Sequence, residues 1–406
     1  MRISRTVSSY LSREFLYLTG SYLILAFLYR FFSYDFIKFH TKYDILTIDF
    51  LEIIQIRVYL YMFFLLAGAV LSEKGMGYKK TALAGAGLMM TGIVLYFLVP
   101  DNALKILGIM AAGFGLFYAG FIGLYVSYIR RFAEKTVMYF VLFLILPDIA
   151  KILQLSLEKI LFALKTDTAL AIILLLINAG AVFFIYSLSG ETSSPRQNIF
   201  SFRKILLYIL PFIFIPLFTV LYQEWSLLKQ LRKMKEFQEP VYLSDMDYAL
   251  LGISAGVLVV MFLRFFRKNK TAVLLGIIIP VFLSFLIMAV PDYNNFTVRL
   301  KDFLFSSAYI LAVSTLYALL MRELPPGWYA RFFVMIIAIE ETVSTVLHII
   351  TAIIYAHFNI KEINFQLNYW DAGLSLVLYG IYIPYVLYGL YLYGKRGSRK
   401  NLSINK

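Results

Sequence analysis

The stretch Gly68-Ala-Val-Leu-Ser-Glu-Lys-Gly-Met-Gly-Tyr-Lys-Lys80 joins two long apolar runs of the chain. A glycine ends the first run, a short turn with one acid and one base follows, and two lysines stand at the start of the next run. Glycines let the chain reverse and let helix backbones approach closely, and lysines favour the cytoplasmic side of a membrane. The pattern predicts two membrane helices that turn back at the cytoplasmic surface.

The composition of the whole chain is that of a membrane protein. Of the 406 residues, 61% are hydrophobic and only 15% are charged, whereas soluble domains are about half apolar and about a quarter charged. A membrane-spanning helix needs about 20 mostly apolar residues, and about twelve such stretches fit the sequence. The chain has no cysteine, which excludes disulfides, thiolate metal sites and cysteine nucleophiles.

The net charge of +14 would suggest a nucleic-acid partner in a soluble protein. Here the cations lie mostly in short segments between apolar runs, so membrane topology explains them and we expect no nucleic acid. With both termini in the cytoplasm, 23 of the 38 lysines and arginines fall on the cytoplasmic side. The basic loop 225–245, on the outer side, is the main departure. We therefore expect a multi-pass protein of the inner (cytoplasmic) membrane with both termini cytoplasmic.

The predicted fold is an all-α membrane protein with twelve transmembrane helices in two pseudo-symmetric six-helix bundles. The predicted helices are 14–34, 48–71, 81–99, 104–128, 136–160, 168–188, 204–224, 246–266, 271–290, 302–321, 329–357 and 371–394. Four segments follow from this map: an N-terminal bundle 1–189, a cytoplasmic central linker 190–203, a C-terminal bundle 204–394 and a basic cytoplasmic tail 395–406.

Two groups of six helices joined by a linker resemble the major facilitator superfamily (MFS) of secondary transporters. The loop after the second predicted helix is similar to that family's signature, G-x-x-x-D-R-x-G-R-R, and the comparable positions are Gly68, Glu73, Lys74, Gly77, Lys79 and Lys80. The acid is glutamate, the following base is lysine, and one or two extra residues precede the final basic pair. The stretch Leu324-Pro-Pro-Gly-Trp-Tyr-Ala-Arg331 matches a Pro-Pro-then-Arg pattern between the tenth and eleventh helices of many members.

The resemblance implies two halves that rock around a site at the membrane midplane. It also implies that the loop 68–80 takes part in gating, and that the third, sixth, ninth and twelfth helices face lipid. The predicted third, sixth and ninth helices carry no ionisable residue in their spans, which agrees with that division.

Ionisable side chains at bilayer depth need a partner, water or a function, because an isolated charge is costly there. On the eleventh predicted helix, Glu341 and His348 share one face with Thr345, and Glu340 points about 100° away. Glu341 lies about 16 Å from the start of this helix, near the midplane. We expect Glu341, Glu340 and His348 to bind protons or substrate; the alternative is a structural role in helix packing.

The fifth and second predicted helices carry the other candidates. Asp148 and Lys151 lie one turn apart on the fifth, too deep for Lys151 to reach the surface easily. On the second, Glu52 lies near the outer end, and Arg57 lies about 16 Å from Gly68. A guanidinium at that depth suits a carboxylate or phosphate on the substrate or on a facing helix. Structural ion pairs are again the alternative.

The sequence therefore predicts a secondary active transporter that moves a small polar or anionic solute by alternating access, coupled to protons. The acids would carry protons, and Arg57 and Lys151 would hold negative charge on the substrate. We expect a monomer with a small-molecule substrate and a coupling ion, and no catalytic residue, cofactor or metal; sodium is the alternative ion.

Three other functions stay open. A carrier or flippase for lipids or lipid-linked substrates would suit the aromatic residues, which make up 17% of the chain. A polytopic membrane enzyme such as a glycosyl- or acyltransferase is disfavoured, because the loop 225–245 has no histidine and the chain has no nucleotide-binding signature. A sensor that does not transport would explain the degenerate loop signature.

Overall fold

The computed structural model describes residues 12–41, 49–98, 103–162, 167–188, 244–266, 269–289, 295–324 and 328–340, and these are almost entirely helical. The predicted helices 204–224 and 371–394, and most of 329–357, lie outside the described residues, as does the loop 225–245. The helices are α2 (Arg13–Thr41), α3 (Asp49–Lys74), α4 (Tyr78–Leu98), α5 (Ala103–Ile129), α6 (Thr136–Phe162), α7 (Asp167–Tyr186), α9 (Asp245–Phe266), α10 (Lys270–Ala289) and α11 (Asn295–Glu323).

A short 3₁₀ helix, η2 (Arg130–Lys135), joins α5 to α6, and a further helical stretch covers residues 329–340. Among the described residues, seven helices are long and apolar enough to cross a membrane: α2, α4, α5, α6, α7, α9 and α11. Each corresponds to a predicted span, because a run of about 20 apolar residues can satisfy its backbone in a bilayer only as a helix or in a closed barrel.

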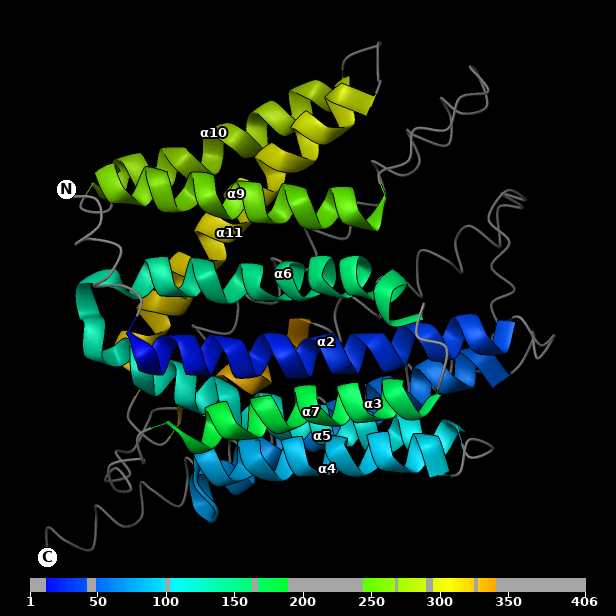
Figure 1. Ribbon diagram of the computed structural model, residues 1–406. Coiled ribbons are helices and arrows are strands. Elements are labelled where there is room, and N and C mark those ends of the chain that lie inside the picture. Colours follow the sequence, from blue (N-terminus) through cyan, green and yellow to red (C-terminus); the bar gives the residue numbers. More distant parts are fainter. Residues whose placement is uncertain are drawn as a thin grey trace, which may run out of the picture. The chain divides into compact units, whose positions relative to one another are not determined.

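The chain divides into two compact units. The first comprises Met1–Ser194, Val241–Glu323 and Trp328–Arg331, and the second comprises Pro195–Pro240, Leu324–Gly327 and Phe332–Lys406. In the first unit, α9, α6, α2, α7, α4 and α5 are joined as a series of neighbouring helices, each packed on the next (Figure 1). Helix α11 packs on α6, α9 and α10.

Helix α5 is the interior helix of this unit. Its apolar span is 83% buried, whereas that of α7 is only 22% buried. Small residues allow the close packing of α5 on α4: a Cβ atom added to Gly85 would lie 2.2 Å from the backbone nitrogen of Phe117. Such backbone contacts drive helix association where lipid removes the usual hydrophobic driving force.

A hydrophobic cluster holds α6, α9 and α11 together. It consists of the buried residues Val141, Ile145, Ala255, Val259, Leu263, Ile310 and Leu311. The cluster fixes the face of α6 that carries Asp148 against α9.

Two local predictions about the loop signature need correction. Helix α3 continues to Lys74 instead of ending near residue 71, because the amides of Gly75 and Met76 both donate to the Leu71 carbonyl, at 3.1 and 2.9 Å. Gly68 does not end the apolar run; it lies inside α3, where an added Cβ would approach the Ala119 Cβ of α5 to 2.9 Å. The reversal occurs at Gly77, whose φ of 80° favours glycine.

Candidate functional site

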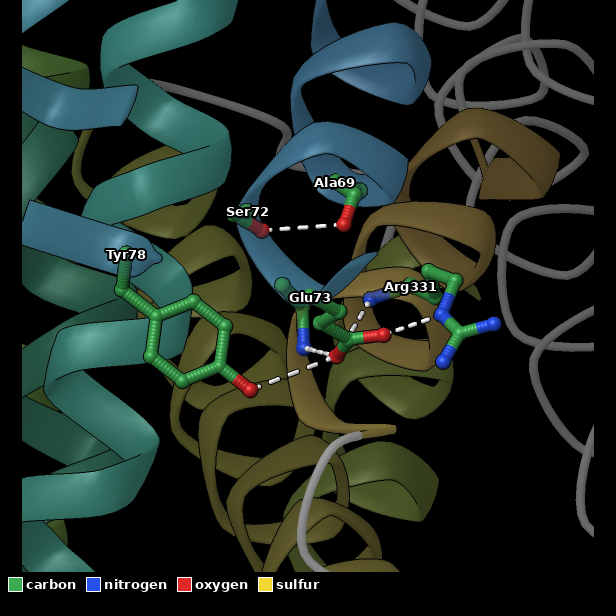
Figure 2. A network of polar contacts seen from close by, with 6 residues as sticks. Ala69, Ser72, Glu73, Tyr78 and Arg331 are labelled. Carbon is green, nitrogen blue, oxygen red and sulfur yellow. Dashed lines mark hydrogen bonds and ion pairs between the residues drawn. The ribbon is translucent and has the colours of Figure 1, made fainter. Parts of the chain in front are cut away.

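The Glu73 carboxylate is the centre of a buried polar network at the end of α3 (Figure 2). The Nε of Arg331 donates to Oε2 of Glu73. The backbone amides of Ala330 and Arg331 donate to Oε1, at 2.8 and 3.3 Å. The Tyr78 hydroxyl, at the start of α4, also donates to Oε1, at 3.4 Å. We call the contact between Glu73 and residues 330–331 the latch.

The latch satisfies a helix terminus and an ion pair at the same time. Ala330 and Arg331 lie in the first turn of the helical stretch 329–340, where amide groups have no acceptor within the helix and the helix dipole favours a negative charge. The Glu73 side chain is 0% exposed and that of Arg331 only 12%. Removing one partner of such a buried pair costs about 3–5 kcal/mol, because the other charge is left uncompensated.

Neighbouring aromatic rings fix both partners of the latch. The Arg331 guanidinium lies over the Trp328 ring, 4.6 Å from its centroid, a distance at which a cation is attracted to the ring face. The Tyr78 ring lies against Gly123 of α5, where an added Cβ would be 2.2 Å from Cδ1 of the tyrosine. The position of the Tyr78 hydroxyl is therefore set by α5.

The structure gives the other residues of the predicted gating loop different positions. Lys79 reaches the end of α7, where its Nζ donates to the Leu188 carbonyl at 2.8 Å and lies 5.2 Å from the centroid of the Tyr186 ring. Lys74 and Lys80 are exposed. The loop signature thus contacts both the stretch 329–340 and the end of α7.

A second polar site lies on α6, around Asp148. An added Cβ at Gly252 of α9 would lie 2.2 Å from Oδ2 of Asp148, so the carboxylate rests directly on the backbone of α9. Lys151 and Arg30 of α2 are close enough for their charges to act on Asp148. All three charged side chains are half-buried. Asp148 and Lys151 lie one turn apart on α6, and Arg30 adds a second positive charge near the carboxylate.

A series of neighbouring aromatic rings joins α2, α5, α6 and α11. Phe143 of α6 and Tyr317 of α11 are buried, with ring centroids 6.5 Å apart. Farther from the latch along α5 and α2, Tyr118 and Tyr29 are half-buried. Both rings stack with Phe114, with centroid distances of 5.9 and 4.5 Å.

Of the remaining predicted site residues, the structure describes the side chain of Glu340 alone. Glu52 and Arg57 lie in the first third of α3, and their side chains are outside the described part of the structure. Glu340 is half-buried at the end of the described stretch. Glu341 and His348 lie outside the described residues.

Sequence reasoning missed Arg30 because the first helix was expected to end near residue 34, which would place this arginine at the rim. Helix α2 in fact continues to Thr41, so Arg30 lies in its interior. Tyr78 was missed because one tyrosine among 31 carries no local signal.

Comparison with solved structures finds the same fold in transporters. A crystal structure described as an MFS transporter, FucP, in the outward conformation is 14% identical, with a TM-score of 0.58, and the match covers 94% of this chain and 97% of that one. A crystal structure of the E. coli fucose:proton symporter FucP is 12% identical, with the same TM-score, covering 95% and 99%.

No protein-family model matches the chain, and no curated protein matches it in sequence. The apolar helices and the structural likeness, which extends over almost the whole length of both chains, agree with each other. The chain is a multi-pass membrane protein with the fold of the major facilitator superfamily.

Proposed function

We propose that this protein is a secondary active transporter that moves a small polar or anionic solute by alternating access, coupled to protons. The observation that carries the proposal is the latch. It joins the end of α3 to the start of the stretch 329–340 through a buried ion pair between residues 258 positions apart in the chain. A buried ion pair is often no more stabilising than apolar residues of similar volume, so its presence here favours a role in opening and closing over one in stability alone.

In this proposal the latch closes the cytoplasmic end of the transport pathway. It breaks when the two halves of the protein rock, and it forms again after the solute has been released. The structural likeness to FucP in the outward conformation supports this assignment, because an outward-facing transporter is closed at its cytoplasmic end. The proposed gating residues are Gly68, Glu73, Lys74, Gly77, Lys79 and Lys80, with Arg331 as the partner of Glu73.

The coupling and binding residues in the proposal surround Asp148. A half-buried acid at membrane depth can exchange a proton when the pathway opens. The cations Arg30 and Lys151 act on it, and they would also attract an anionic group of the solute. Glu52, Arg57, Glu340, Glu341 and His348 remain proposed contributors from the other pathway-lining helices.

The proposed architecture keeps twelve helices in two bundles, 1–189 and 204–394, with the linker 190–203 and both termini in the cytoplasm. The proposed membrane is the inner (cytoplasmic) membrane, and the proposed transporting unit is a monomer. The named activity of FucP as a fucose:proton symporter supports coupling to protons.

Proton release on adding candidate solutes to the purified protein in weakly buffered detergent tests this function. We would compare the unmodified chain with Asp148→Asn and Glu341→Gln. Asp247→Asn, a substitution of an acid paired with Arg299 at 3.1 Å on the surface, is the control. We expect the unmodified chain to release protons with one class of solute. Asp148→Asn and Glu341→Gln should each abolish this release, and Asp247→Asn should retain it. Solute binding without proton release in the unmodified chain would refute proton coupling and favour sodium coupling or uniport.

A further inference from the structure

Arg130 makes a second contact with the helical stretch that the latch engages. Its guanidinium lies over the Tyr329 ring, 5.5 Å from the ring centroid. Tyr329 is only 3% exposed and directly precedes Ala330 and Arg331, whose amides bind Glu73. Arg130 is the first residue of η2, directly after α5, and is therefore on a different element from Glu73.

The contact is directed by the geometry of η2. The backbone leaves the helical conformation at Phe132, where φ is −121° and ψ is 60°. Arg131 instead bonds Glu14 of α2 at 2.8 Å, so the two adjacent arginines have different partners. Of the two arginines, Arg130 is the one that contacts Tyr329.

We infer that Arg130 and Tyr329 form a second arm of the latch and, with Glu73 and Arg331, hold the closed state of the cytoplasmic gate. This inference rests on the proposed gating function. The two arms use different chemistry: the first joins a carboxylate to a guanidinium and helix amides, and the second joins a guanidinium to an aromatic face. Both arms contact the same first helical turn. Separation of that turn from α3 and α5 therefore breaks both contacts.

The chemistry of the second arm predicts which substitutions it tolerates. The interaction needs a cation over a ring face. Arg130→Lys and Tyr329→Phe should therefore retain much of it, whereas Arg130→Gln and Tyr329→Leu remove it. Arg131→Gln is the matched control, since it removes the adjacent charge without touching Tyr329.

The absence of cysteine from the chain provides a direct readout of gate opening. Ser72 precedes Glu73, is 4% exposed and is close to cysteine in size. In a Ser72→Cys background, the rate of maleimide labelling of the purified protein in lipid nanodiscs reports how often this end of α3 becomes accessible. Each variant is placed in that background.

We expect Arg130→Gln and Tyr329→Leu each to raise the labelling rate about two- to five-fold, the factor that a cation–π contact at a partly exposed site provides. The double variant should label no faster than the faster single variant, because both substitutions remove one interaction. Arg130→Lys, Tyr329→Phe and Arg131→Gln should label close to the background rate.

Glu73→Gln in the same background separates the two claims. If it accelerates labelling while Arg130→Gln and Tyr329→Leu do not, the second arm is wrong and the latch stands. If Glu73→Gln leaves the rate unchanged, the gating function on which the inference rests is refuted. Additive effects of Arg130→Gln and Tyr329→Leu would show that the two residues do not act as a pair and would also overturn the inference.

Discussion

Glu73 and Arg331 form a buried ion pair between the end of α3 and the first turn of the stretch 329–340. The acid lies in a loop signature read from the sequence, and the base lies at the end of a Pro-Pro-containing segment read separately. Each residue stands out in the sequence because its segment resembles a motif of the MFS family. Their contact shows that two motifs far apart in the sequence meet in the folded protein.

The first prediction concerns the charge of Glu73. Glu73→Gln should destabilise the closed state by about 3–5 kcal/mol, because Arg331 is left buried without a counter-charge. The measurement is thiol labelling at Ser72→Cys together with thermal unfolding in detergent. Glu73→Gln combined with Arg331→Gln should be less destabilised than the sum of the two single variants. Strict additivity would mean that the pair is not energetically coupled.

The second prediction concerns the support of Glu73 by Tyr78. Tyr78→Phe should lower the stability of the closed state by about 0.5–1.5 kcal/mol, the usual net value of one hydrogen bond. Gly123→Ala should cost more, because the new Cβ would lie 2.2 Å from the tyrosine ring and displace it. The effect of Tyr78→Phe should largely disappear in a Glu73→Ala background if Tyr78 acts through the carboxylate, whereas the steric cost of Gly123→Ala should persist. Equal effects of Tyr78→Phe with and without Glu73 would assign Tyr78 to helix packing alone.

The third prediction tests the contact of Asp148 with α9. Gly252→Ala places a Cβ 2.2 Å from the Asp148 carboxylate, so α6 and α9 must separate or Asp148 must move. We expect solute-coupled proton release to fall at least several-fold while the protein remains folded. Gly87→Ala is the matched control, because nothing lies within 4 Å of its added Cβ. A normal proton-release signal in Gly252→Ala would show that the contact between Asp148 and the backbone of α9 has no role in coupling.

The fourth prediction concerns Lys79, which joins the loop signature to the end of α7. Lys79→Met removes the hydrogen bond from Lys79 to the Leu188 carbonyl, just beyond α7. Amide hydrogen exchange at residues 183–188 should therefore rise, because this segment loses a stabilising contact. Lys80→Met, a substitution of the adjacent exposed lysine, should leave exchange in that segment unchanged. Matching exchange in both variants would refute a specific role for Lys79.

Much of the fold could be predicted from the sequence. The seven described membrane-capable helices each overlap a predicted span, and the apolar span of α11 differs most, because it begins at residue 295 instead of 302. The agreement follows because the length of an apolar run is a local property of the sequence. The ends were less predictable: α3 runs on through Glu73 and Lys74, since polar residues at a membrane surface can remain helical until a glycine ends the helix.

The candidate site was only partly predictable. Glu73 could be singled out because its loop resembles the MFS signature, and Asp148 because charges are rare and costly in apolar segments. Arg30 could not, because its depth depends on how far α2 extends, and the aromatic partners Trp328 and Tyr329 could not be separated from the other rings of a chain with 31 tyrosines and 37 phenylalanines.

The sequence by itself determined the membrane class and the positions of the seven described apolar helices, because these depend on hydropathy within short windows. Only the tertiary structure decided that Glu73 binds Arg331, that Arg130 covers Tyr329 and that Asp148 rests on Gly252. Those pairings depend on which helix faces meet and how closely, and that is set by the packing of many residues at once.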